Sequence, residues 1–289
     1  MNILLTGATG YIGQSVIREL LPRGHHILAC CRHPERLSLT SPQTQLISID
    51  YRQMLEPESW YEYLKAVDVV INCVGIIIET PQQRFEILHT KAPIALFNAA
   101  VTLGVNKIIQ VSALGADEHA QSAYHLSKKA ADDALRQLPI THIILQPSIV
   151  YGHGAVSTEL FSALAALPVH FLLDTDESLL QPIHIEDVVA CVCRCVEPDI
   201  TESRTYSLVG AEPIKYRDYL QGLRKQLGKP IAKTYTLNAY SYSLLTTLMP
   251  LLGEPMLSKD NLTMLRNGNY GDTNDTSTLL KRSPQNLTT

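Results

Sequence analysis

The sequence predicts an α/β protein with a doubly wound parallel sheet and a small C-terminal lobe. Short apolar runs of strand length alternate with helical stretches through the first half of the chain. These runs are almost continuously apolar, which is typical of parallel strands covered on both faces. The alternation becomes irregular after residue 147, where prolines interrupt it. Right-handed crossovers between the strands then give helices on both sides of one sheet.

Six apolar segments are the expected strands of the first half. Helices are expected over residues 11–21, 57–65, 84–103 and 122–137, and Pro93 should kink or split the third of them. The strands are predicted at residues 3–5, 26–31, 46–49, 67–74, 107–111 and 142–145.

The second half contributes the remaining sheet elements and a lobe. A helix and a short strand are expected within 157–185, a helix over 186–196 and a late strand over 204–209. We therefore predict a first domain over 1–155 and the remaining sheet elements with the smaller lobe over 156–289. The lobe should contain helices over 215–227, 238–249 and 258–267, and the polar end, 272–289, should be frayed.

Composition excludes several classes of protein. The chain has 289 residues, of which 45% are hydrophobic and 18% charged, so it can bury a large core and is not a disordered chain. A net charge of −4 does not suggest a nucleic-acid surface. Six cysteines without a signal peptide favour a reducing, cytoplasmic location.

No apolar run reaches the length of a transmembrane helix. The nearest, residues 244–252, is too short and contains Pro250. A helix of the core or lobe is favoured there over peripheral membrane contact.

Three glycines lie between the first expected strand and the first expected helix. In that context Gly7 permits a tight turn, Gly10 admits a pyrophosphate and Gly13 brings the helix close to the strand. The helix N-terminus would supply free N–H groups to the phosphates. A turn that merely reverses the chain is the alternative. We predict a dinucleotide site that includes Gly7, Ala8, Thr9, Gly10, Tyr11, Ile12 and Gly13.

The residue after the second strand should choose between cofactors. An acidic residue there would bind a free ribose hydroxyl, but the chain has Arg32, which suits a 2′-phosphate. NADP(H) is therefore preferred over NAD(H), unless Arg32 is only a solvated loop charge. Asp50 and Tyr51 should lie at the adenine edge. Cys73, Val74 and Gly75 close the fourth strand, where the ribose should approach.

A second group of residues has the spacing of an acid–base site. Tyr124 and Lys128 are four residues apart, so they share one face of a helix. A free phenol titrates near ~10, and a neighbouring ammonium should lower that pKa. Ser112, at the end of the fifth strand, could hold the same substrate oxygen. The alternative is a surface tyrosine beside a solvated lysine.

Together these motifs resemble the short-chain dehydrogenase/reductase superfamily. Further stretches resemble an atypical branch, namely the NADPH-binding accessory subunit of respiratory complex I and bacterial NAD(P)-dependent epimerase/dehydratase-like proteins. The stretches that carry this second resemblance are residues 111–117, 146–152, 181–188 and 257–262.

The resemblance implies a Rossmann-type sheet of seven strands and particular roles for several residues. It implies Ser112, Tyr124 and Lys128 in the catalytic positions, with Lys128 also on the nicotinamide ribose. Pro147 would lie near the nicotinamide carboxamide. Gln146 departs from the pattern, because related proteins commonly carry Arg there.

Two functions remain open. The first is an oxidoreductase or epimerase that transfers a hydride to or from a carbonyl or alcohol of a small-molecule substrate. The second is a non-catalytic NADPH-binding accessory or redox-sensing protein with a protein partner. A monomer and a homodimer are both compatible with the sequence.

Two further groups of residues are expected to be structural. Cys191, Cys193 and Cys195 alternate along one helix, and buried side chains are favoured over a metal site. Asp187 should act as an N-terminal charge or cap of that helix. We therefore predict no metal site.

Overall fold

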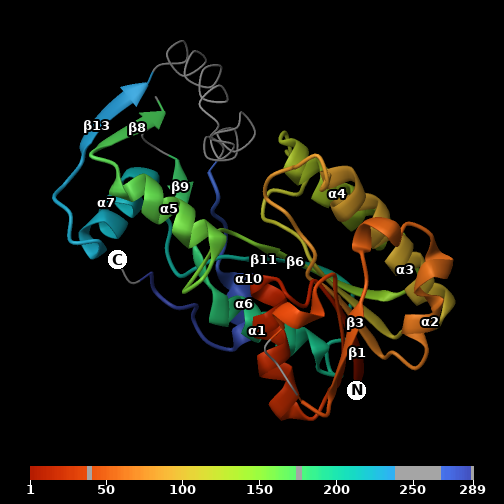
Figure 1. The fold of residues 1–289 in the computed structure, drawn as a ribbon. Helices are drawn as coiled ribbons and strands as arrows, with labels where there is room; N and C mark the ends of the chain where they lie inside the picture. Colours follow the sequence, from red (N-terminus) through yellow and green to blue (C-terminus); the bar gives the residue numbers. More distant parts are fainter. Residues whose placement is uncertain (38–40, 174–177, 238–267, 288–289) are drawn as a thin grey trace.

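The computed structural model describes residues 1–37, 41–173, 178–237 and 268–287. Its centre is a parallel sheet of seven strands in the order β11-β6-β5-β4-β1-β2-β3 (Figure 1). This confirms the predicted fold class. The strands are β1 (Asn2–Thr6), β2 (His26–Cys31), β3 (Thr44–Ser48), β4 (Val69–Asn72), β5 (Lys107–Val111), β6 (Thr141–Pro147) and β11 (Arg204–Leu208).

Helices cover both faces of the sheet, and each face has its own apolar core. On one face lie α1 (Tyr11–Leu20), α6 (Ile185–Val196) and α10 (Asn274–Leu280). The other face carries α2 (Tyr61–Leu64), α3 (Ala92–Thr102) and α4 (Ala123–Arg136) (Figure 1). Helix α1 packs against the sheet because apolar residues recur at helical spacing along it, and Val16, Ile17 and Leu20 among them are fully buried. Short 3₁₀ turns connect the elements: η1 (Leu21–Arg23), η2 (Pro34–Arg36), η3 (Tyr51–Gln53) and η4 (Pro57–Trp60).

The strand order places the topological switch point of the sheet, where folds of this kind have a crevice, between the ends of β1 and β4. The chain leaves β1 toward β2 on one side, whereas β4 continues toward β5 on the other. Loops diverge at such a switch point, and ligands of doubly wound sheets bind there. The two loops are in close contact, because a Cβ atom on Gly7 would lie 2.8 Å from the carbonyl carbon of Cys73.

The helix predicted over 84–103 has two parts. Its first part, η5 (Glu86–Lys91), is a π-helix, and α3 follows directly. Pro93 lies in the first turn of α3, where the missing N–H of proline is tolerated. The proline therefore marks a change of helix type rather than an end of the helix.

The lobe has a separate small core on α5 (Val156–Ala166) and α7 (Tyr216–Gln226). Arg224 of α7 holds the end of α5, because its Nη1 donates to the carbonyls of Ala165 and Leu167 at 2.9 and 2.7 Å. The helices predicted over 238–249 and 258–267 lie outside the described residues. Paired short strands complete the lobe: β8 (Val169–Leu173) with β13 (Lys233–Leu237), β9 (Leu179–Leu180) with β12 (Ile214–Lys215), and β7 (Val150–Tyr151) with β10 (Ile183–His184).

The frayed C-terminal end is a wrong prediction. Residues from Asn274 form α10, which packs on α6 and buries Leu279. Beyond it, Arg282 Nη2 donates to Asp187 at 2.6 Å, and the Gln285 N–H donates to the same carboxylate at 2.7 Å. Asp187 therefore anchors the tail, and the cap of α6 is His184, whose Nδ1 accepts from the Glu186 N–H.

Helix α6 also shows the expected burial of its cysteines. Cys191, Cys193 and Cys195 are fully buried and reduced, as predicted. Within the described part of the chain, no helix is both long and apolar enough to cross a membrane.

Candidate functional site

The glycine turn lies at the crevice with the predicted geometry. Gly7 has a φ of 73°, a conformation that favours glycine. A Cβ atom on Gly13 would lie 2.2 Å from the Gly7 carbonyl oxygen, so only glycine lets α1 approach β1 this closely. Gly10 is exposed at the N-cap of α1. No side chain caps this helix and no acidic residue lies in its first turn, which leaves its N–H groups suited to an anion.

The adenosine side of the crevice is built from the ends of β2 and β3. Arg32 follows β2 and is exposed. Asp50 follows β3, and Arg52 holds its carboxylate through a 2.9 Å contact from Nε to Oδ1 and a 2.5 Å contact from Nη2 to Oδ2. These bonds lower the pKa of Asp50, despite some opposing burial. Tyr51 is different, because its side chain is buried, with its ring against Trp60 and its hydroxyl bonded to Asn72, so the ring does not line the adenine edge.

Asn72 connects the walls of the crevice, a role that sequence reasoning missed. It is buried at the end of β4, and its Oδ1 accepts from Thr6 Oγ1 at 2.6 Å and from Tyr51 Oη at 3.1 Å. The same oxygen accepts from the Val74 N–H at 3.3 Å. Its Nδ2 donates to Gln110 Oε1 at 2.7 Å. The sequence signal that could have identified Asn72 is its place as a polar residue at the end of an apolar strand.

Lys128 is buried where α4 crosses the ends of β4 and β5. Its Nζ donates to the carbonyl oxygens of Val74 and Val111, both at 3.2 Å. A Cβ atom on Gly75 would also lie 3.2 Å from Nζ, so the lysine reaches the exposed loop after β4. Burial lowers the pKa of Lys128 to about 8, and the charge of Asp132 opposes that shift.

Tyr124 lies one turn before Lys128 and is half-buried among aromatic rings. The ring centroids of Phe85, His89 and His125 are 5.8, 5.5 and 5.3 Å from its own. Burial raises the pKa of Tyr124 to about 12, and the charge of Asp132 adds to that shift. The predicted lowering of this pKa by Lys128 is therefore wrong for the protein alone, because burial disfavours the charged phenolate.

Ser112 is buried and faces α4 rather than open solvent. Its Oγ donates to Asp132 Oδ2 at 2.5 Å, and Gln146 Nε2 approaches the same oxygen at 3.4 Å. Gln146 also donates to the Ala116 carbonyl at 3.2 Å, so an amide occupies the position that the resemblance assigns to arginine. Burial raises the pKa of Asp132 to about 6, although the Ser112 bond opposes this. Pro147 is buried beside this group, and its carbonyl accepts from the Leu114 N–H.

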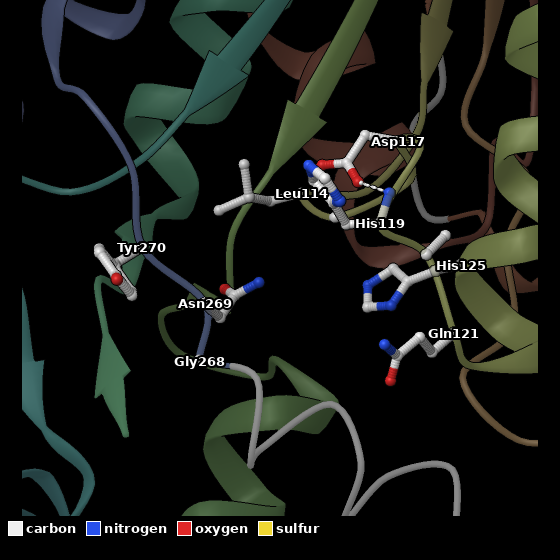
Figure 2. A pocket seen from close by; sticks show the side chains of 10 residues that line it. Leu114, Asp117, His119, Gln121, His125, Gly268, Asn269 and Tyr270 are labelled. Carbon is white, nitrogen blue, oxygen red and sulfur yellow. Dashed lines mark hydrogen bonds between the residues drawn. The ribbon is translucent and has the colours of Figure 1, made fainter. Parts of the chain in front are cut away.

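A cavity of about 380 Å³ opens beside the start of α4. The loop after β5, the first turn of α4 and the segment 268–270 form its walls. Figure 2 shows His125 and Asn269 projecting toward this space from opposite sides. Sequence reasoning missed these residues, since the walls come from segments far apart in the chain. The lining residues are Leu114, Gly115, Asp117, His119, Ala120, Gln121, His125, Gly268, Asn269 and Tyr270.

Known proteins share this fold and parts of this sequence. A ceramide reductase of Caulobacter vibrioides is 30% identical over 193 residues, which cover 65% of this chain and 58% of that protein. Mitochondrial NADH dehydrogenase (ubiquinone) 1 alpha subcomplex subunit 9 of Rattus norvegicus is 24% identical over 272 residues, which cover 89% and 69%. The chain thus spans little more than half of the ceramide reductase.

Solved structures show the same architecture. An NADPH-dependent quinone oxidoreductase of Escherichia coli, solved with NADPH, has a TM-score of 0.77 at 21% identity, and the match covers 99% of this chain and 97% of that one. The NAD(P)H-binding family model matches residues 7–164, more than half of the chain. The chain therefore belongs to the NAD(P)H-binding family, as an atypical protein of the short-chain dehydrogenase/reductase type.

Proposed function

We propose that the protein is an NADP(H)-dependent reductase of a carbonyl compound. The observation that carries this proposal is the contact between α4 and the loop after β4, where Lys128 Nζ lies beside Gly75. That contact brings the Tyr124–Lys128 pair to the crevice that the glycine turn borders. The Caulobacter ceramide reductase and the Escherichia quinone oxidoreductase support a reductase, since both are named for reductions.

The chain's own residues divide the work as follows. The nicotinamide, when bound, supplies the hydride. Tyr124 donates a proton to the substrate oxygen, and its raised pKa keeps the phenol protonated at neutral pH, which suits reduction. Lys128 holds the ribose hydroxyls through Nζ. Ser112 orients the substrate oxygen only when its hydroxyl leaves Asp132, because its single proton is otherwise engaged.

The site distinguishes NADP(H) from NAD(H) through Arg32. Within the described ranges, no carboxylate forms an ion pair with this guanidinium, and Asp50 beside it is held by Arg52. A 2′-phosphate would meet a planar cation that can bind it through two hydrogen bonds. Asp50 and the loop from Cys73 to Gly75 complete the contacts to adenosine and ribose.

The cavity beside α4 is proposed as the substrate site. It adjoins Tyr124 through His125, and its volume suits a ligand of moderate size. Histidine, amide and carboxylate groups share its lining with Leu114 and Tyr270, so it suits a substrate with both a polar and an apolar part.

The test follows reduced-nicotinamide absorbance while ketones, aldehydes and quinones are offered to the purified chain with NADPH. Tyr124→Phe should lower kcat by about 100-fold or more, the range for loss of a positioned proton donor, and leave the Kd for NADPH within a few-fold. Tyr63→Phe is the control, because that phenol lies on α2, away from the crevice. Turnover by Tyr124→Phe equal to that of the control would refute the mechanism.

A second candidate is an accessory protein that binds NADPH without turnover. The observation that favours it is the similarity to the NADH dehydrogenase subunit, which extends over 89% of this chain. In that case NADPH stabilises the fold, and a protein partner takes the place of the substrate. This candidate would be favoured if NADPH raised Tm but none of the ketones, aldehydes and quinones offered caused NADPH to be oxidised. A cytoplasmic location and a monomeric or homodimeric state are part of both proposals.

A further inference from the structure

We propose that His89 is a positioning residue, which connects the loop after β4 to Tyr124 and does so only as a neutral imidazole protonated on Nδ1. This inference rests on the proposed function and adds a residue to its site. His89 lies in η5, next to both halves of the site. A Cβ atom on Gly75 would lie 3.2 Å from Lys128 Nζ and 3.8 Å from His89 Nε2, so both side chains face the same glycine.

The first contact determines the state of Nε2. The main-chain N–H of Ile76 donates to His89 Nε2 at 3.0 Å. A main-chain amide can only donate, so Nε2 carries no proton. The contact ties the imidazole to the residue that follows Gly75 in the loop proposed to face the ribose.

The second contact determines the state of Nδ1 independently. His89 Nδ1 lies 2.9 Å from Ser127 Oγ, and that hydroxyl donates its proton to the Tyr124 carbonyl at 2.7 Å. Ser127 therefore has no proton left for His89 and must accept one from Nδ1. The two ends of the ring agree on one tautomer. A chain of hydrogen bonds thus runs from the Ile76 amide through His89 and Ser127 to the Tyr124 main chain.

Packing holds the ring in this place. His89 is only 1% exposed, its ring stacks on Phe85 at 5.1 Å, and its edge meets the Tyr124 ring at 5.5 Å. Burial lowers the pKa of His89 to about 2, and the charge of Lys128 contributes. Tyr124 on α4 is a further titratable group that faces it. The imidazole is therefore neutral throughout the physiological range and is not a proton donor to substrate.

The π-helix explains how one turn reaches α4 twice. Thr90 Oγ1 donates to the Ser127 carbonyl at 2.9 Å, while the preceding His89 bonds the Ser127 hydroxyl. Single π-helical turns occur frequently at functional sites. Here the wider turn lets two successive side chains, His89 and Thr90, form hydrogen bonds with Ser127. Ser127 lies on α4, the helix that carries the catalytic pair.

Two substitutions separate the two contacts. In His89→Gln the amide can reach the position of Nε2 and accept from Ile76, but the donor to Ser127 is lost. In His89→Asn the amide lies at the position of Nδ1 and can donate to Ser127, but the contact with Ile76 is lost. His170→Gln is the matched control, because His170 is 3% exposed and lies in β8 of the lobe.

The expected result is a crossed pattern. His89→Gln should keep the Kd for NADPH near that of wild type and lower kcat by about 3- to 10-fold, the effect of one hydrogen bond. His89→Asn should keep more of kcat and weaken NADPH binding by a similar factor of about 3 to 10. A merely structural role would lower Tm without this split between binding and turnover.

Nitrogen NMR of histidine-labelled wild-type protein tests the tautomer without substrate or cofactor. The His89 signals, assigned by their loss in His89→Gln, should show a protonated Nδ1, a bare Nε2 and no titration between about pH 5 and 8, since the shift places the pKa far lower. An Nε2–H tautomer, or a ring that titrates in this range, would overturn the proposal. So would His89 variants that bind and turn over like His170→Gln.

The outcomes also separate this inference from the proposed function. Wild-type protein that binds no NADPH would overturn both. Wild-type protein that binds and reduces a carbonyl, with either a wrong tautomer or no crossed pattern, would overturn the role of His89 alone.

Discussion

The Ser112 hydroxyl donates a hydrogen bond of 2.5 Å to the buried Asp132 carboxylate. This bond joins the end of β5 to the face of α4 that also carries Lys128. It engages the one proton that Ser112 would offer to a substrate. It also places a carboxylate with a pKa of about 6 inside the site, where the nearest side-chain partner on β6 is the neutral Gln146 rather than a cation.

Asp132 should make stability depend on pH. Its pKa is raised in the folded protein from 3.8 to about 6, so the folded state binds the proton more tightly than the unfolded state. The contribution of protonated Asp132 to the stability of the fold is fully present below about pH 4. It is lost as the pH rises through about 6. The difference in free energy of unfolding between Asp132→Asn and wild type should therefore shift in favour of the variant by on the order of 2 kcal/mol from pH 4 to pH 7.5.

Urea unfolding at several pH values measures this shift. Asp133→Asn is the matched control, because Asp133 lies on the same helix with its side chain 47% exposed. A pH dependence in Asp132→Asn that equals that of wild type would contradict the raised pKa.

Ser112 and Asp132 should be energetically coupled. Ser112→Ala leaves the buried carboxylate without its strongest partner and should cost about 1–3 kcal/mol of stability. The same change in the Asp132→Asn background should cost less, because the carboxylate is absent. A double-mutant cycle gives the coupling energy. Costs that simply add would show that the bond contributes nothing.

Asn72 should support both stability and cofactor binding. Asn72→Ala removes the acceptor of three donors, those of Thr6, Tyr51 and Val74, and should destabilise the fold by about 2 kcal/mol or more. Because the Val74 loop loses its anchor, the Kd for NADPH should rise as well. Asn98→Ala is the control, since the Asn98 side chain donates to the Ile94 carbonyl within α3. Calorimetric unfolding and NADPH titration give the two readouts, and an unchanged Kd would exclude Asn72 from the site.

Arg32 should set the preference between cofactors. Arg32→Glu should weaken NADPH binding and spare NADH, because a carboxylate repels the 2′-phosphate and accepts from a free hydroxyl. The ratio of the two Kd values should change by at least ~10-fold, the size of one charge-assisted contact. Arg18→Glu, on the exposed face of α1, is the control for net charge. If the ratio of the Kd values for NADPH and NADH changed equally in Arg32→Glu and Arg18→Glu, Arg32 would not be the residue that binds the 2′-phosphate.

Gly13 should tolerate no side chain. In Gly13→Ala the new Cβ atom would meet the Gly7 carbonyl oxygen at 2.2 Å, so α1 must move away from β1. NADPH binding should be lost and Tm lowered. Gly24→Ala has open space around the new atom and only a φ of 80° to oppose it, so it should lower Tm slightly and leave binding intact. NADPH binding by Gly13→Ala at wild-type affinity would contradict the role of the turn.

Much of the fold was predictable because its signals are local. The apolar runs that became β1, β2, β4 and β5 are continuous in sequence, and burial on both faces explains why. The tail shows the limit of such reasoning. Residues after 272 are mostly polar, yet Thr276 and Leu279 are buried because α6 lies beside them, and only the folded chain brings these segments together.

The sequence by itself determined the turn of Gly7, Gly10 and Gly13 and the shared face of Tyr124 and Lys128, since both follow from spacing within one element. Only the tertiary structure decided what surrounds those groups. Ser112 meets Asp132, Asn72 collects three donors, and His89 reaches both the β4 loop and α4, all through contacts between segments distant in the chain. Desolvation depends on those surroundings. For that reason burial raises the pKa of Tyr124, whereas the spacing to Lys128 predicted that it would fall.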